Sequence, residues 1–305
     1  MKQIHCPLFF IGMLLFPSCT NLPKVENTAA KTYDGLVQVV AYAPWLFSGS
    51  KPIGEEGFAS LQSLHVRTIV CVDGTPPELN IPEQIGIKTY HIPIKYGKLT
   101  SQQVFDIVTA VEIGRRRGNT YIHCHHGKHR SAVAAAISLI SLGESTPEKM
   151  MPRMLVSETS ALYSGLLESV REAVVLDSRC YVENKKNIPS SVLPVGITEQ
   201  MIALEFALEN LLHIEKSNWL PPTFHPDLVP AAEAGALAES FRALNSSELA
   251  KKFPSDFAEQ LFAAWSAAST LENLFVTNTA TQAQLSEALN TVKNSCTACH
   301  RSYRK

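Results

Sequence analysis

The sequence predicts two folded units in tandem: an α/β unit with a mainly parallel sheet flanked by helices, then an all-α unit of four helices. Three observations lead to this fold class. The 305 residues are enough for two domains of about 150 residues, and the 45% apolar content can fill two cores. Short β-rich runs alternate with helical patterns between residues 36 and 177. From residue 197 onward only helical periods remain.

Composition and charge narrow the function classes. Lys and Arg number 27 against 28 Asp and Glu, which gives a net charge of −1. With this balance we do not expect an extensive nucleic-acid-binding surface. The spacing of the seven cysteines is irregular and is not typical of a disulfide framework, so each requires its own explanation. They are Cys6, Cys19, Cys71, Cys124, Cys180, Cys296 and Cys299.

The N-terminus is typical of an export signal, which we place at residues 1–19. Lys2 precedes an apolar run at 8–16 that would span about 14 Å as a helix, half of the about 30 Å needed to cross a membrane. Cys19 follows a small residue and resembles the lipid-modified cysteine of bacterial lipoproteins. Simple cleavage further on, near Ala29, is the alternative. Residues 20–35 are polar without an apolar period and predict a tether.

The first unit, residues 36–177, is expected to form the α/β fold. Its strands are expected at 36–43, 67–72, 88–94 and 120–123. A helix is expected at 101–117, because Thr100 and Gln103 have capping-box spacing.

The segment after the last of these strands carries the strongest chemical signal. It reads Cys124-His-His-Gly-Lys-His-Arg130-Ser131 and leads into a helix at 132–142. A loop between a strand and a helix N-terminus directs backbone N–H groups at an anion, and this one is sized for a phosphate. That field favours a Cys124 thiolate, while the Arg130 fork can hold phosphoryl oxygens and Ser131 can hydrogen-bond the sulfur. The expected phosphate-binding residues are His125, His126, Gly127, Lys128, His129 and Arg130.

This segment resembles the protein tyrosine and dual-specificity phosphatases, whose signature is His-Cys, five residues, Arg, then Ser or Thr. His123, Cys124, Gly127, Arg130 and Ser131 match it. The resemblance implies a nucleophilic Cys124, a cysteinyl-phosphate intermediate, and a phosphorylated protein or small phosphate monoester as substrate. Two alternatives stay open. One is a buried structural cysteine, and the other is a zinc site built from the clustered histidines. The zinc site is not favoured, because adjacent side chains in a tight loop cannot easily face one metal ion.

One departure concerns the general acid. The resemblance implies an Asp after a Tyr on a preceding loop, but Gly97 follows Tyr96 here. Asp73 is the substitute candidate, since it ends a strand whose carboxyl end would approach the site; a simple turn with Gly74 is the alternative. Without an acid, the unit could instead be a catalytically weak phospho-anion binding module. The resemblance also suggests a reversible disulfide between Cys71 and Cys124, with a buried inert Cys71 thiol as the alternative.

Residues 178–195 are rich in Ser, Pro and Asn and predict a linker to the second unit, residues 196–305. Apolar residues recur at helical spacing at Met201, Leu204, Leu208 and Leu211, and again between 257 and 275. Further helices are expected at 230–244 and from Thr281, where Gln284 completes a capping box. These four helices predict an antiparallel four-helix bundle.

The last helix contains Cys296-Thr-Ala-Cys299-His300 on one face. Two thioethers and an imidazole in this order are the attachment chemistry of c-type haem. A thioredoxin-type redox pair is the alternative, but that motif opens a helix after a strand. The segment 196–305 resembles the cytochrome c-prime family, which also has an aromatic residue and an Arg here, as at Tyr303 and Arg304.

This second resemblance implies one covalent haem c, with Cys296 and Cys299 as attachments and His300 as iron ligand. Met201 is placed like a sixth ligand, although core packing explains it equally well. A filled sixth position favours electron transfer with a redox partner, and a vacant one favours a small gas ligand. Together the sequence predicts an exported, periplasmic phosphatase joined to a cytochrome, with a lipid anchor on Cys19 as its only membrane attachment.

Overall fold

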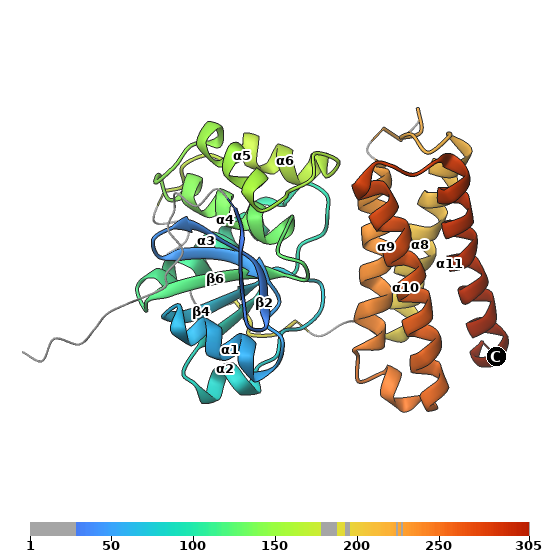
Figure 1. Ribbon diagram of the computed structural model, residues 1–305, viewed down its shortest axis with the longest axis horizontal. Helices are drawn as coiled ribbons and strands as arrows, with labels where there is room; N and C mark the ends of the chain where they lie inside the picture. The colour runs from blue at the N-terminus through green and yellow to red at the C-terminus, as the bar shows by residue number, and fades with distance from the viewer. Residues whose placement is uncertain (1–28, 178–187, 193–195, 224, 227, 305) are drawn as a thin grey trace, which may run out of the picture.

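The structure is a computed structural model that describes residues 29–177, 188–192 and 196–304, except residues 224 and 227. The expected export signal at 1–19, Cys6, Cys19, Cys180 and most of the expected linker lie outside the described residues. Figure 1 shows an α/β unit beside a helical region. Within the described part of the chain, no helix is long and apolar enough to cross a membrane.

The α/β unit is built on a six-stranded sheet with the order β1-β2-β3-β6-β4-β5. Its central pairs, β3 with β6, β6 with β4 and β4 with β5, are parallel, whereas β1, β2 and β3 pair antiparallel. The strands are β1 Lys31–Tyr33, β2 Leu36–Ala43, β3 Leu46–Ser50, β4 Val66–Cys71, β5 Lys88–His91 and β6 Asn119–Cys124.

The sheet is therefore mixed, and the expectation of a mainly parallel sheet is corrected. The two-residue connection between β2 and β3 makes a hairpin, which is necessarily antiparallel. β3 was not predicted, because its Ser-Gly-Ser end is typical of a turn. β1 was not predicted either; it is a short polar strand within the segment expected to be a tether.

Helices cover both faces of the sheet, as Figure 1 shows. On one face α1 (Gly54–Ser63) buries Phe58 and Leu61 against strand residues such as Ile69. On the other face the neighbouring strand residues, among them Val70, pack against α3 and α4. This alternation follows from the period of two along a strand. The remaining helices are α2 Asn80–Gln84, α3 Ser101–Arg115, α4 Arg130–Ser141, α5 Pro147–Val156 and α6 Ser164–Arg171.

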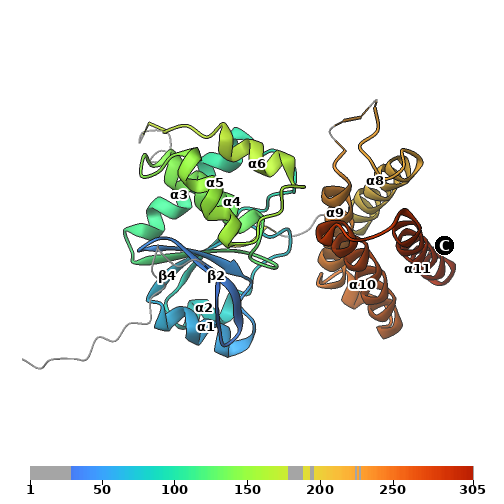
Figure 2. The same cartoon turned by 45° about the horizontal axis from the view of Figure 1, so that its top comes forward.

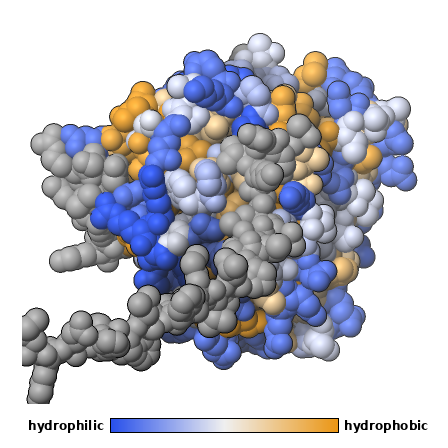
Figure 3. Space-filling view, turned by 60° about the vertical axis from the view of Figure 1, so that its left-hand side comes forward, coloured by the Kyte–Doolittle hydropathy of each residue, from blue (hydrophilic) through white to orange (hydrophobic). Residues whose placement is uncertain are grey.

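Helix α4 is the central element of the unit, because all twelve of its residues are buried. Its sequence is rich in Ala, Val and Ile, which explains why it can be enclosed on all sides. The predicted capping box of α3 is confirmed, with the Gln103 N–H donating to Thr100 Oγ1 at 3.2 Å. The face of the unit in Figure 3 is mostly polar, with apolar side chains only in small separate groups.

The C-terminal region is helical, as predicted, with α8 Ile197–Lys216, α9 Pro230–Asn245, α10 Ser255–Thr277 and α11 Gln282–Tyr303. Helix α9 packs against both α8 and α10, and α10 packs against α11. The apolar seam predicted between 257 and 275 is buried along α10. The capping box at Thr281 and Gln284 is also confirmed.

Helix α9 lies on the side of the helical region that faces the α/β unit, as Figures 1 and 2 agree. Close contacts cross between the units there. Tyr163 Oη donates to Glu272 Oε1 of α10 at 3.0 Å. A Cβ on Gly235 of α9 would lie 3.0 Å from the Tyr96 ring, so this glycine allows a close approach.

Candidate functional site

The predicted phosphate loop lies at the carboxyl end of the central strand β6. Cys124 is the last residue of β6 and Arg130 is the first residue of α4, so the loop occupies 125–129. The strand lies between β3 and β4, where the carboxyl ends of parallel strands form a site. The Cys124 thiol is 3% exposed and donates to the Ser131 hydroxyl at 3.5 Å. The structure thus brings these two residues together.

The loop folds tightly because β3 lies directly against it. Gly127 has a φ of +78°, and a Cβ there would collide with the backbone of Gly49 and Ser50. The Lys51 N–H donates to the His125 carbonyl at 3.2 Å. Both the left-handed conformation and the close approach therefore require glycine at 127.

Arg130 is buried, at 2% exposure, and is held by the segment that follows β5. Its guanidinium lies 4.6 Å from the centre of the Tyr96 ring, and its Nη2 donates to Tyr96 Oη at 3.3 Å. Nη1 donates to the Ile94 carbonyl at 3.4 Å. The Nε–H is buried without a hydrogen-bond partner among the described residues. One donor of the predicted phosphate clamp is thus free to take an anion.

A carboxylate of the helical region is the strongest partner of this guanidinium. Arg130 Nη1 donates to Glu239 Oε1 at 2.6 Å and to Oε2 at 2.5 Å. The Gly74 N–H donates to the same Oε1 at 2.5 Å. Glu239 was not predicted as a site residue. It is 109 positions from Arg130, and a Glu on a helix surface carries no signal of a distant partner.

Asp73, the expected substitute general acid, is held in ion pairs in this structure, and its role as an acid stays a prediction. It is 1% exposed, and its Oδ1 lies 2.5 Å from Arg242 Nη2 and 3.5 Å from Arg130 Nη2. Burial raises the pKa of Asp73, but the two guanidinium groups outweigh this and hold the pKa well below its ordinary value. An ionised carboxylate has no proton to donate at neutral pH, so Asp73 acts here as a counterion.

The histidines of the loop are neutral. Burial lowers the pKa of His125 and of His129 to about 3, and it lowers the pKa of His126 as well. The Lys128 ammonium pairs with Glu158 at 2.6 Å. Of the six predicted phosphate-binding residues, Arg130 is therefore the only one whose side chain brings a positive charge to the loop interior, and a role of the others through backbone N–H groups stays a prediction.

The clustered histidines do not form a metal site in the described part of the chain, where no group of three or more His, Cys, Asp or Glu side chains is arranged to hold an ion. His125 and His126 contact each other edge to face at 4.4 Å. His129 Nδ1 instead accepts from the Ser160 N–H at 3.2 Å. The side chains thus face different partners, as expected for adjacent residues in a tight loop.

The suggested disulfide between Cys71 and Cys124 is not supported. Both thiols are free. Cys71 pairs in register with His123, so its side chain leaves the sheet on the opposite face from Cys124. Burial raises the pKa of Cys71 above its ordinary value, which keeps it a thiol. The alternative, a buried inert cysteine, describes Cys71.

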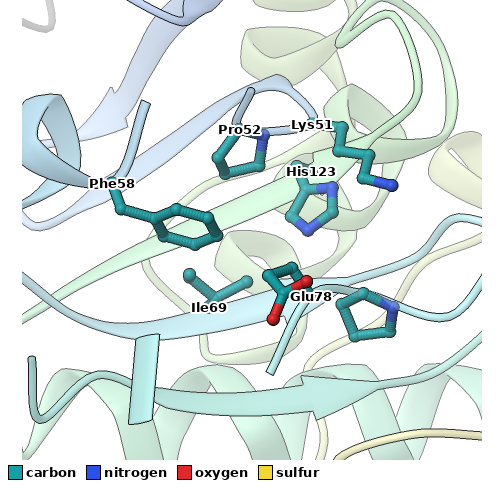
Figure 4. A pocket seen from close by; sticks show the side chains of 7 residues that line it. Lys51, Pro52, Phe58, Ile69, Glu78 and His123 are labelled. Carbon is teal, nitrogen blue, oxygen red and sulfur yellow. The ribbon is translucent and has the colours of Figure 1, made fainter. Parts of the chain in front are cut away.

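A small cavity lies behind the loop, as Figure 4 shows. Its volume is about 10 Å³, room for one water molecule, and His123 Nδ1 is buried without a partner among the described residues. Burial lowers the pKa of His123 to about 4. The cavity is far too small for a substrate, so it belongs to the support of the loop. Its lining comprises Lys51, Pro52, Phe58, Ile69, Pro77, Glu78 and His123.

A second and much larger cavity lies among the four C-terminal helices. Its volume of about 740 Å³ is within the range of about 300–1,000 Å³ found for small-molecule and cofactor sites. All the residues predicted to hold a haem line it, from two different helices: Met201 on α8, and Cys296, Cys299 and His300 on α11. Most of the remaining lining is apolar, including Leu237 and Phe241 of α9.

Comparison with known proteins bears on the first unit. Residues 42–173 match the family model described as "Swiss Army Knife protein, DSP-PTPase phosphatase domain". Among curated proteins none matches the chain. The match over 42–173 supports a cysteine-dependent phosphatase, in agreement with the placement of Cys124, Arg130 and Ser131.

Solved structures similar to the chain include phosphatases from bacteria and yeast. TpbA of P. aeruginosa is 19% identical, with 52% of this chain and 96% of that chain covered and a TM-score of 0.40. The core catalytic domain of the PP-IP phosphatase SIW14 from S. cerevisiae is 18% identical, with 50% and 95% covered and a TM-score of 0.37. A putative phosphatase from Shewanella putrefaciens is 18% identical, with 45% and 90% covered and a TM-score of 0.34.

The packing of the loop against β3 predicts that Gly127→Ala is more harmful than an ordinary loss of glycine. Gly86 is the matched control, because it has a φ of +73° and a Cβ at this position would have nothing within 4 Å. Gly86→Ala should cost about 1 kcal/mol of unfolding free energy from backbone strain alone. Gly127→Ala should cost clearly more, measured by urea denaturation of the two variants in parallel. Equal costs would contradict the close approach of the loop to β3.

Proposed function

We propose that the chain is an exported phosphatase that hydrolyses phosphate monoesters through a cysteinyl-phosphate intermediate and is joined to a c-type haem domain. The observation that carries the first part is the arrangement of Cys124, Ser131 and Arg130 around a strand–loop–helix anion site. The substrate is a phosphorylated protein or a small phosphate monoester.

In the first chemical step the Cys124 thiolate attacks phosphorus, so that an S–P bond forms as the P–O bond to the leaving group breaks. The Nε–H of Arg130, buried without a partner among the described residues, and the N–H groups of the loop hold the phosphoryl oxygens as negative charge gathers on them. In the second step water attacks phosphorus, inorganic phosphate leaves, and the electron pair of the S–P bond returns to sulfur. The Ser131 hydroxyl, 3.5 Å from this sulfur, can donate to the returning thiolate.

Protonation of the leaving oxygen is the incomplete part of this machinery. Position 97 is a glycine, and the ion-paired Asp73 keeps no proton at neutral pH. The enzyme should therefore favour aryl phosphates, whose leaving groups depart without a proton. A second candidate function, a phospho-anion binding module with weak activity, is favoured by the same glycine and by the Glu239 carboxylate on Arg130.

We propose further that the C-terminal region is a four-helix bundle of the cytochrome c-prime type with one covalent haem c. The cavity of about 740 Å³ and its lining fit this group in size, in apolar character and in the ligands that it needs. Cys296 and Cys299 would form the two thioethers and His300 would ligate the iron, while Met201 is the residue available as a sixth ligand. The haem would supply one-electron exchange with a redox partner or binding of a small gas.

Export supports both halves of the proposal. The N-terminal segment has the pattern of an export signal, and c-type haem is attached outside the bacterial cytoplasm in the family that the second unit resembles. We therefore place the protein in the periplasm, with Cys19 as the residue that would carry a lipid anchor.

The phosphatase proposal predicts that Cys124→Ser abolishes hydrolysis of p-nitrophenyl phosphate, because a serine hydroxyl is not ionised at neutral pH and is a much weaker nucleophile than a thiolate. Cys71→Ala is the matched control, since Cys71 is equally buried but faces away from the loop. It should keep activity once folded. Binding of inorganic phosphate, measured by calorimetry, should survive in Cys124→Ser. Equal hydrolysis by wild type and Cys124→Ser would leave only the binding-module function.

The missing acid predicts a gain of function for Gly97→Asp. A Cβ at this position has nothing within 4 Å, so the side chain has room. A positioned acid contributes about 10²- to 10⁴-fold, and the gain should be largest for alkyl phosphates with poor leaving groups. Gly97→Asn is the control, because Asn has nearly the shape of Asp but no carboxyl proton to donate. The measurement is kcat/KM across a series of leaving groups, and the same gain for Asp and Asn would refute an acid role for this position.

The haem proposal predicts a covalently coloured protein when the chain is matured in a host that attaches haem c. Cys299→Ala should lose the covalent haem signal on a denaturing gel, and Cys71→Ala should keep it. His300→Ala should retain a covalent link while its Soret band changes, because this residue would act on the iron and not on the thioethers. A colourless wild-type protein from such a host would contradict the proposal.

A further inference from the structure

We propose that helix α9 is an internal inhibitor of the phosphatase site, with the Glu239 carboxylate held where the phosphoryl group of the substrate would bind. We propose also that the cavity on the other face of α9 controls its release. The inference rests on the proposed function of both units, and it gives the two units a reason to be joined.

Glu239 occupies one of the donors that a substrate's anionic group would need, the Arg130 guanidinium. Both carboxylate oxygens accept from Arg130 Nη1, at 2.6 and 2.5 Å, and Oε1 also accepts from the Gly74 N–H. A carboxylate on a guanidinium and a backbone N–H is a close analogue of a phosphoryl group on the same donors. In this arrangement Arg130 is 2% exposed and Cys124 is 3% exposed, so a phosphorylated protein cannot reach either residue.

The Glu239 carboxylate satisfies only some of the hydrogen-bonding groups at the site. The Arg130 Nε–H and His125 Nδ1 remain buried without hydrogen-bond partners in the described part of the chain. A phosphoryl group carries three oxygens and could engage the Nε–H, which lies on a guanidinium edge that Glu239, bound at Nη1, leaves unused. A substrate therefore has more to gain at Arg130 than Glu239 does, and displacement of Glu239 is energetically accessible.

The surrounding contacts fix α9 in this blocking position. Arg242 donates to Asp73 Oδ1 at 2.5 Å and to the Thr75 hydroxyl, and Glu272 of α10 accepts from Tyr163 at 3.0 Å. The charges are complementary: Glu239 meets a cation, and Arg242 meets an anion. Such a polar contact between units is typical of an interface that can open, unlike a large apolar one.

The energetics of the buried ion pairs also favour an interface that can open. Taking charges out of water offsets much of their attraction, so pairs of this kind add little net stability. Burial raises the pKa of Glu239 even though Arg130 beside it opposes the change. The nearby Asp73 carboxylate also raises the pKa of Glu239, so burial and this like charge both oppose the ionised form in the contact.

Helix α9 contacts both sites at once. Gly235, Glu239 and Arg242 follow each other at steps of four and three and so share the face toward the α/β unit. Leu237 and Phe241 lie on the opposite face of α9 and line the cavity of about 740 Å³. A rigid helix that forms a wall of one site and a plug of the other couples them, provided that the two positions of α9 bind the group in the cavity with different affinity.

The first test removes the plug from the full-length protein. Glu239→Ala should bind inorganic phosphate at least about fivefold more tightly by calorimetry, and it should raise kcat/KM for p-nitrophenyl phosphate. Arg242→Ala, which removes the second ion pair that holds α9 against the α/β unit, should shift both quantities in the same direction. Glu248→Gln, a change at an exposed carboxylate, is the matched control and should shift neither. The gain in rate should vanish when Cys124→Ser is added.

The sign of the effect decides between opposite roles for Glu239. If Glu239 instead holds Arg130 in its catalytic position, Glu239→Ala would weaken phosphate binding, and this would overturn the proposal. Unchanged phosphate binding in both Glu239→Ala and Arg242→Ala would overturn it as well. Tighter phosphate binding without any hydrolysis would support the plug and would count against the proposed phosphatase function alone.

The second test addresses control by the cavity. Phosphate affinity and hydrogen–deuterium exchange of residues 235–242 would be compared in the haem-loaded protein, oxidised and reduced, and in a Cys296→Ala, Cys299→Ala double variant. A change of about fivefold or more in phosphate affinity between any two of these states, with a matching change in exchange over α9, is the expected result. Identical affinity and exchange in all three states would overturn control by the cavity.

Discussion

The buried guanidinium of Arg130 is the interaction on which the rest of the arrangement depends. A charge removed from water costs several kcal/mol unless partners surround it, and here the partners come from three parts of the chain. Tyr96 stacks on it, Asp73 balances its charge at 3.5 Å, and Glu239 accepts from it across the boundary between the units. Arg130 lies at the first turn of the fully buried α4 and is 2% exposed while α9 is in contact with it. The surrounding segments are therefore arranged around one fixed positive charge.

The balance of charges at the site also limits what the loop can hold. The three loop histidines are neutral because burial lowers the pKa of each, and Lys128 is engaged by Glu158. The positive charges at the site are the guanidinium groups of Arg130 and Arg242, and Asp73 lies against both. A phosphate dianion added to the carboxylates of Asp73 and Glu239 would exceed these two positive charges, so phosphate and Glu239 should compete for the site.

Local sequence patterns predicted the parts of the fold that local chemistry decides. The strand expected at 36–43 is β2 residue for residue, and both capping boxes are present, because each depends on residues within a few positions of one another. β3 was missed because its turn-like residues owe their strand conformation to pairing with β6. The ion pair of Asp73 with Arg242 was not predicted, because the two residues are 169 positions apart in the sequence. The contact of Glu239 with Arg130 could not be predicted either, since each unit has a complete pattern of its own.

Helix α9 connects the phosphatase site with the cavity of the helical region, and only one of its two faces has a pattern that the sequence reveals. Its cavity-facing residues, such as Leu237 and Phe241, follow the apolar period that any helix of a bundle would have, so the sequence reveals only that face. Its other face carries few apolar residues but places a small residue and two charges opposite Tyr96, Arg130 and Asp73. An isolated bundle would leave those two charges in water at no cost. Burial of these two charges against the phosphatase site therefore costs desolvation free energy. An interface with such a cost is retained most readily where opening and closing of the contact has a function.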